Sequence, residues 1–214
     1  MKRWLMVLLF GMGLAACNND DNQTNTSVNS PELAPSLAEG TYQVSVETSD
    51  ELPLAGRYYS GADGNKFLVL YDANERAKIV MQYDAKTKKW QSNQNDNSKA
   101  LIFAHQEQVS ASQIGLEQLV GSYTLSLSNG STVPVEINAQ GQLSSKDQNC
   151  AFTGAITANQ IAQTMSYELT VNSCEDMKNN MKGFVVVDDN SAPASFRLLS
   201  ASVGSQDILA FEGV

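Results

Sequence analysis

Nucleophilic catalysis in this protein would have to use His105, because it is the only histidine among the 214 residues. Serine and cysteine nucleophiles are commonly activated by a histidine base. The sequence contains no Gly-x-Ser-x-Gly turn, no His-Glu-x-x-His pair and no phosphate-cradling glycine loop. His105 follows the alternating residues Leu101 and Phe103, so we expect it to end a strand as a solvated side chain. These patterns predict a protein that is not an enzyme and has no cofactor.

Adjacent carboxylates are the other candidates for acid–base chemistry, at Glu175-Asp176 and Asp188-Asp189. Neighbouring residues of a strand point to opposite faces, so we expect both pairs to be solvated turns. Asp72-Ala73-Asn74 has the opening spacing of a calcium loop, but Glu75-Arg76 breaks the required pattern. The sequence therefore predicts no metal site.

The first sixteen residues have the composition of an export signal. Lys2 and Arg3 precede an apolar or glycine stretch from Trp4 to Gly13. About ten to twelve apolar residues are too few for a membrane-spanning helix of ~20 residues, and they suit the apolar region of a signal peptide.

The end of this leader, Leu14-Ala15-Ala16-Cys17, resembles the lipobox of bacterial lipoproteins. The resemblance covers only the leader (1–16) and Cys17. It implies cleavage before Cys17, thioether lipidation of Cys17 and acylation of the new amino group, and two or more acyl chains attach a protein stably to a membrane. Asn18 stands where inner-membrane lipoproteins of enteric bacteria tend to carry Asp, so the resemblance points to the outer membrane. The alternative is an ordinary secretory leader with an incidental cysteine.

With Cys17 lipidated, Cys150 and Cys174 are the remaining cysteines. An even pair in an exported protein predicts a disulfide, and two reduced buried thiols are the alternative. Phe152 and Ile156 have even residue numbers, as the two cysteines do, whereas Leu169 and Val171 on the expected partner strand have odd numbers. Alternate residues of a strand share one face, so even and odd positions lie on opposite faces. Placing all four apolar side chains on one face and the cysteines opposite each other needs one extra residue. We predict a bulge near Asn172-Ser173. The alternative is that Cys174 lies just past the last pair of the ladder.

Composition argues against nucleic acid as a partner. Without Lys2 and Arg3, twelve basic residues stand against 23 acidic ones, a net charge of −11, whereas phosphate binding needs clustered Lys and Arg. The densest basic run, Lys86-Thr87-Lys88-Lys89, is interpreted as a solvated hairpin tip rather than a binding patch.

Aromatic residues on loops often mark recognition surfaces. Tyr58, Tyr59 and Trp90, the one tryptophan outside the leader, are the candidate binding residues. Placement of these side chains in the core is the alternative.

Residues 17–39 are rich in Asn, Asp, Thr, Ser and Pro, and we expect a disordered tether that carries the lipidated Cys17. From Gly40 onwards apolar residues alternate with polar ones, and turn dipeptides such as Asp63-Gly64, Asn129-Gly130 and Gln140-Gly141 separate the runs. Many short strands at close spacing predict an all-β fold, an antiparallel meander that closes into a barrel or a sandwich.

Two related β-units are expected, at 40–111 and 119–214. Leu54-Ala55-Gly56-Arg57-Tyr58 matches Leu119-Val120-Gly121-Ser122-Tyr123, and the offsets after each turn glycine agree, with Val69 against Val135. The match predicts that Tyr58 and Tyr123 are equivalent. Residues 112–118 would connect the units, either as one or two helical turns after a Ser112 cap or as an extended linker.

The function predicted from these features is non-enzymatic: binding of an envelope partner, or a structural role, at the outer membrane. The partners expected are the membrane, through Cys17, and an envelope protein or other macromolecule. The alternative is a carrier that holds a small apolar ligand inside a β-barrel.

Overall fold

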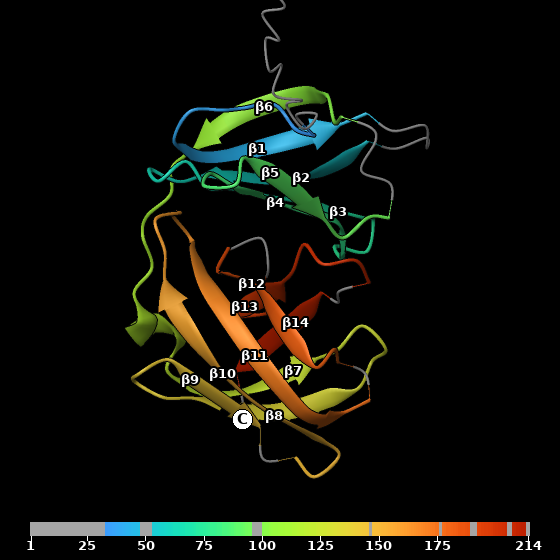
Figure 1. Ribbon diagram of the computed structural model, residues 1–214, viewed down its shortest axis with the longest axis vertical. Coiled ribbons are helices and arrows are strands. Elements are labelled where there is room, and N and C mark those ends of the chain that lie inside the picture. The colour runs from blue at the N-terminus through green and yellow to red at the C-terminus, as the bar shows by residue number, and fades with distance from the viewer. Residues whose placement is uncertain are drawn as a thin grey trace, which may run out of the picture.

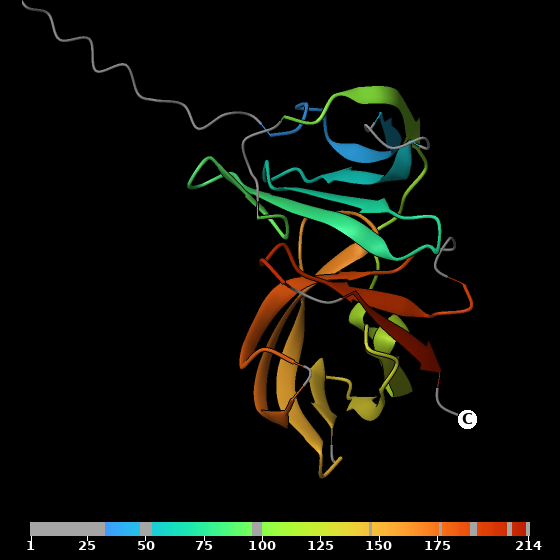
Figure 2. The same cartoon turned by 90° about the vertical axis from the view of Figure 1, so that its right-hand side faces the viewer.

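The computed structural model describes residues 33–47, 53–95, 100–145, 147–175, 177–188, 192–204 and 207–212. They form a six-stranded antiparallel sheet stacked on an eight-stranded closed barrel (Figure 1, Figure 2). The all-β prediction is confirmed. The leader, Cys17, Asp176 and Asp189 lie outside the described residues.

The sheet has the order β5-β4-β3-β2-β1-β6, and every neighbouring pair is antiparallel. Its strands are β1 (Gly40–Val46), β2 (Leu54–Ser60), β3 (Lys66–Tyr71), β4 (Ala77–Asp84), β5 (Lys89–Ser92) and β6 (Phe103–Val109). The tip between β4 and β5 contains the basic run, where the backbone amides of Lys86 and Thr87 donate to Asp84. These hydrogen bonds lower the pKa of the Asp84 carboxyl.

The barrel is an up-and-down meander in which β14 pairs with β7 to close the cylinder. Its strands are β7 (Gly121–Ser126), β8 (Thr132–Ile137), β9 (Gln142–Ser145), β10 (Cys150–Ala158), β11 (Thr164–Cys174), β12 (Asn180–Val186), β13 (Phe196–Leu199) and β14 (Ile208–Glu212). A single 3-10 turn, η1 (Leu116–Leu119), precedes β7. The helical turn begins after Gly115, so the predicted cap at Ser112 is wrong.

Three apolar clusters hold the fold together. One fills the barrel interior, and a second covers the face of the sheet that carries Val44, Tyr58 and Leu68. The third joins the two units, since Tyr59 and Phe67 of the sheet pack with Phe184 of the barrel. The rings of Phe67 and Phe184 have centroids 4.3 Å apart. Both faces of the sheet are therefore covered.

The predicted disordered tether is wrong for residues 33–39, which pack against the sheet. Leu33 and Ala34 are buried in the second cluster, and the hydroxyl of Ser60 donates to the carbonyl oxygen of Leu37. The physical reason is that this short apolar stretch covers a sheet face that solvent would otherwise reach.

The disulfide hairpin matches its prediction. Cys150 and Cys174 are bonded and directly opposite each other. Ala151 pairs with Ser173 and Phe152 pairs with Val171, so Asn172 is the extra residue of a bulge. The predicted register irregularity is confirmed at its predicted position.

The predicted equivalence of Tyr58 and Tyr123 is wrong. Tyr58 pairs with Leu68, while Tyr123 pairs with Val135. Consequently Tyr58 and Val69 lie on opposite faces of the sheet, whereas Tyr123 and Val135 share the barrel interior. Tyr58 and Tyr123 are 65 positions apart, whereas Val69 and Val135 are 66 apart. The two matches are compatible only if one hairpin has an extra residue, and neither hairpin contains such a bulge.

A shorter correspondence does exist at a constant offset. Asp63 and Asn129 occupy the same place in two turns, each accepting the backbone amide two residues later. Asp72 and Asn138 do the same in the next pair of turns. Because the same offset of 66 relates both pairs of turns, it makes Thr124, not Tyr123, the counterpart of Tyr58.

Candidate functional site at the junction of sheet and barrel

Two of the three aromatic binding candidates are core residues. Tyr58 and Tyr59 are fully buried on opposite faces of β2, which confirms core placement for both and excludes them as exposed binding residues. Trp90 is half-buried and packs against the second cluster. The centroids of the Trp90 and Tyr83 rings are 5.3 Å apart. Residues that are adjacent in a strand point to opposite faces. The face of Tyr58 is covered by residues 33–37 and the face of Tyr59 by the barrel, so both side chains are buried.

His105 does not end its strand, because β6 runs on to Val109. Its side chain is exposed and lies 3.8 Å from the carboxylate of Glu107 on the same edge strand. No cluster of three or more metal-ligating side chains occurs within the described ranges.

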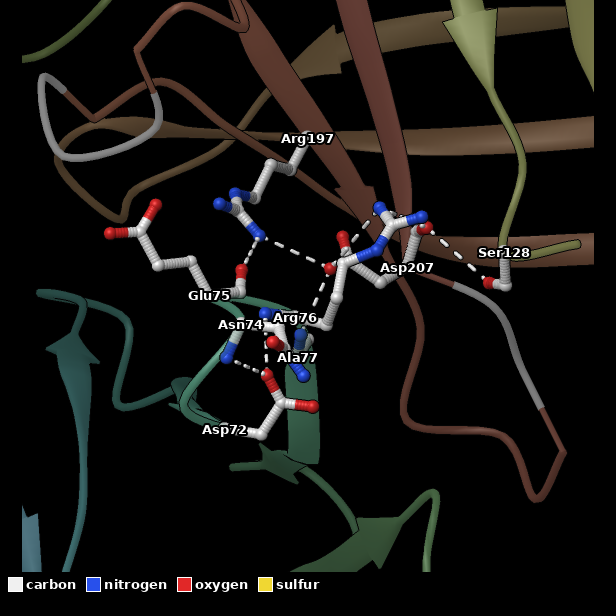
Figure 3. A network of polar contacts seen from close by, with 8 residues as sticks. All are labelled: Asp72, Asn74, Glu75, Arg76, Ala77, Ser128, Arg197 and Asp207. Atoms are coloured by element: carbon white, nitrogen blue, oxygen red, sulfur yellow. Dashed lines mark hydrogen bonds and ion pairs between the residues drawn. The ribbon is translucent and has the colours of Figure 1, made fainter. Parts of the chain in front are cut away.

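A polar network joins the two units around Asp207 (Figure 3). The guanidinium of Arg197, on β13, lies 3.1 Å from the Asp207 carboxylate and donates to the carbonyl oxygen of Glu75 at 2.6 Å. The same carboxylate accepts the backbone amide of Ala77 at 2.9 Å. The network thereby holds the β3–β4 turn of the sheet against the barrel.

A second ion pair crosses the junction. Arg57 of β2 donates through Nε to Asp188, which follows β12, at 3.0 Å. Asp188 is buried, so its prediction as a solvated turn residue is wrong. Burial, together with the nearby Tyr71 and Asp188, raises the pKa of the Tyr59 phenol well above its usual value.

A groove of about 560 Å³ opens beside these ion pairs. Its lining comes from both units: Gln43 of β1, Pro53 and the first residues of β2 (54–57), the end of β3 and the turn after it (71–75), Lys78 of β4 and Arg197 of β13. Tyr71 forms part of the wall, and the guanidinium of Arg197 lies 4.9 Å from the centre of its ring. The volume falls in the range of about 300–1,000 Å³ typical of ligand pockets.

The groove combines an aromatic wall with hydrogen-bonding groups and with charges of both signs, since Lys78, Asp72 and Glu75 line it beside the two arginines. Arg57 and Arg197 are each paired with a carboxylate, so their charges are already compensated. Nη1 of Arg57 is buried and has no hydrogen-bond partner among the described residues. The exposed side-chain amides of Gln43 and Asn74, together with the aromatic wall of Tyr71, suit an apolar group that carries a hydrogen-bond acceptor.

Sequence reasoning missed Arg57, Arg197 and Asp207. Arg197 stands between Phe196 and Leu198, a pattern that predicts a solvated position on an outward face. In the structure it is 4% exposed, because the outward face of the barrel meets the sheet. Every residue of β13 is buried. Recognising Arg197 as a buried charge therefore required knowing that both faces of this strand are covered.

The interior of the barrel is packed rather than open. Apolar side chains from all eight barrel strands meet there in one cluster that includes Phe152, Tyr167 and Phe196, which are essentially fully buried. Burial raises the pKa of the Tyr167 phenol above its usual value.

Comparison with protein-family models, with curated proteins and with solved structures gave no match. In the part of the chain that the structure describes, no helix is long and apolar enough to cross a membrane.

Proposed function

We propose that this protein is an outer-membrane lipoprotein, anchored through Cys17, with a non-enzymatic binding role. The observation that best supports the binding role is the groove at the junction of sheet and barrel. Two buried ion pairs and a shared apolar cluster fix its two walls relative to each other. A preformed concave site loses little conformational entropy on binding.

The proposed occupant is an envelope protein that inserts an apolar side chain next to a backbone carbonyl group. Tyr71 provides the apolar contact, and the exposed side-chain amide of Gln43 provides the donor. An extended segment satisfies both requirements. Its side chains project from its faces, and its carbonyl groups project from its edges.

Photo-crosslinking in cells tests this proposal. A photoreactive residue replaces Asn74, an exposed residue of the groove lining, and the matched control position is Thr170, exposed on the outer face of β11. We expect a defined adduct from position 74 that is absent from position 170. Adding Ala55→Trp, which fills the groove from an exposed position, should abolish it. Equal adducts at both positions, or none at position 74, would overturn the proposal.

The anchor has its own test. Mass spectrometry of the mature N-terminus should show a lipid-modified Cys17, and Cys17→Ser should release or misprocess the protein. An unmodified N-terminus that begins elsewhere would contradict the lipoprotein assignment.

A carrier of a small apolar ligand remains the alternative, since an eight-stranded barrel is compatible with that role. The packed interior favours the binding role, because a carrier would have to displace core side chains. Native mass spectrometry of the full chain distinguishes the two: stoichiometric retention of an apolar molecule would favour the carrier.

A further inference from the structure

A second hollow lies on another side of the junction, apart from the groove. It has a volume of about 660 Å³ and is lined mainly by polar residues from both units. The sheet contributes Thr41, Ser60 and Gln108, the connector contributes Gln113, and the β10–β11 turn contributes Gln160.

One buried hydrogen-bonding group in the lining of this hollow lacks a partner within the described ranges. Thr41 is 1% exposed, yet its hydroxyl has no hydrogen-bond partner among the residues that the structure describes. Buried hydroxyls are nearly always hydrogen-bonded in native proteins. The unmet hydroxyl therefore points to a ligand or to ordered water in the hollow.

Three glutamine side chains extend the same hydrogen-bonding surface. Gln108, Gln113 and Gln160 are exposed and reach the hollow from three separate segments. Each amide offers two donors and one acceptor oxygen. The backbone amide of Gln163 donates to the carbonyl oxygen of Ser112 at 3.0 Å, which holds the connector against the barrel.

Charge restricts what the hollow can take. Glu39 is its one charged lining residue among those described, so an anionic ligand would be repelled. Amides and hydroxyls that both donate and accept match a neutral ligand with many hydroxyl groups. We propose that the hollow at Thr41, Gln108, Gln113 and Gln160 is a binding site for a neutral saccharide.

Side-chain amide resonances provide a direct test. The purified full chain is titrated with maltose and with the disaccharide of N-acetylglucosamine at millimolar concentrations. We expect at least one of them to shift the side-chain amide signals of Gln108, Gln113 and Gln160, and glucuronate to bind more weakly because of Glu39.

The variant Gln113→Ala with Gln160→Ala should weaken binding on the order of tenfold or more, since it removes at least two hydrogen bonds. Gln91→Ala, at an exposed position of β5 remote from the hollow lining, should leave the affinity unchanged. No shift with either disaccharide, or affinity that survives the double substitution, would overturn the proposal. Ala55→Trp in the groove should not affect saccharide binding, so this test and that of the groove can fail independently.

Discussion

The backbone amide of Leu101 donates a hydrogen bond of 2.8 Å to the carbonyl oxygen of Leu33. It ties the first described segment of the chain to the residues that lead into β6. Leu33 is 4% exposed and packs in the cluster on one face of the sheet, so the segment is part of the core.

Shortening Leu33 should therefore destabilise the fold. We expect Leu33→Ala to lower the free energy of unfolding by about 2–5 kcal/mol, the usual cost of a large-to-small core substitution. Urea denaturation measures it, with the exposed neighbour Glu39→Ala as the control. An effect of Leu33→Ala no larger than that of the control would show that residues 33–37 do not contribute to the core.

The ion pair of Arg197 and Asp207 should be strongly coupled to folding. Arg197→Met removes the nearer of the two guanidinium groups that face the buried Asp207 carboxylate and leaves Arg76 at 3.9 Å. We expect a loss of about 3 kcal/mol, at the low end for a broken buried ion pair. Adding Asp207→Asn should restore part of this loss, because the amide oxygen can still accept from Ala77.

The pair Lys182–Glu168 is a matched control in the same protein. Its two side chains are about 70% exposed and 2.8 Å apart, and such pairs contribute about 0–1 kcal/mol. A double-mutant cycle on each pair gives the comparison. Equal coupling energies would refute the role of Arg197 in fixing the junction.

The bulge at Asn172 should be removable. Deleting Asn172 leaves Ala151 opposite Ser173 and Cys150 opposite Cys174 in a regular ladder, so we expect the disulfide to form at a cost of about 1 kcal/mol, typical of a single change. Deleting Thr170 should be worse, because it turns the side chain of Val171 away from the core at a cost of about 2–3 kcal/mol. Thiol titration and thermal unfolding distinguish the two, and an equal loss would contradict this register.

Removing the disulfide with Cys150→Ala and Cys174→Ala should cost about 2–5 kcal/mol. The two cysteines are 24 residues apart, and closing a loop removes conformational entropy from the unfolded chain by an amount that grows with the logarithm of the loop length. Unfolding of the oxidised and double-alanine proteins in urea measures the difference. An unchanged midpoint would contradict the expected stabilisation.

Stability should fall at alkaline pH. Burial raises the pKa of Tyr59, Tyr71 and Tyr167 above the value of about 10 for an unfolded chain. The stabilisation from these neutral phenols is fully present below pH ~10, and it is lost as the pH rises through the higher folded-state pKa values.

Urea midpoints between about pH 8 and about pH 11 measure this loss. Tyr167→Phe should reduce it and cost little at neutral pH, since no described residue is a hydrogen-bond partner of the Tyr167 hydroxyl. A wild-type alkaline loss that persists unchanged in Tyr167→Phe would contradict this assignment for Tyr167.

Local patterns determined the strands, the turns and the register of the disulfide hairpin. Alternation with period two is a property of the strand itself, and the parity of Cys150, Phe152, Val171 and Cys174 required one extra residue wherever the two strands meet. The chain alone therefore predicted a bulge near Asn172-Ser173 or a Cys174 beyond the ladder, and the pairing of Cys150 with Cys174 decides for the bulge.

Only the tertiary structure decided which polar residues are buried. Alternation separates the two faces of a strand but does not say what covers each face. Arg57 and Asp188 are 131 positions apart, and the sequence around each predicts a solvated residue. They form an ion pair because the barrel packs against the sheet. The groove and the hollow exist for the same reason: both are formed by residues of two units whose contact no local pattern specifies.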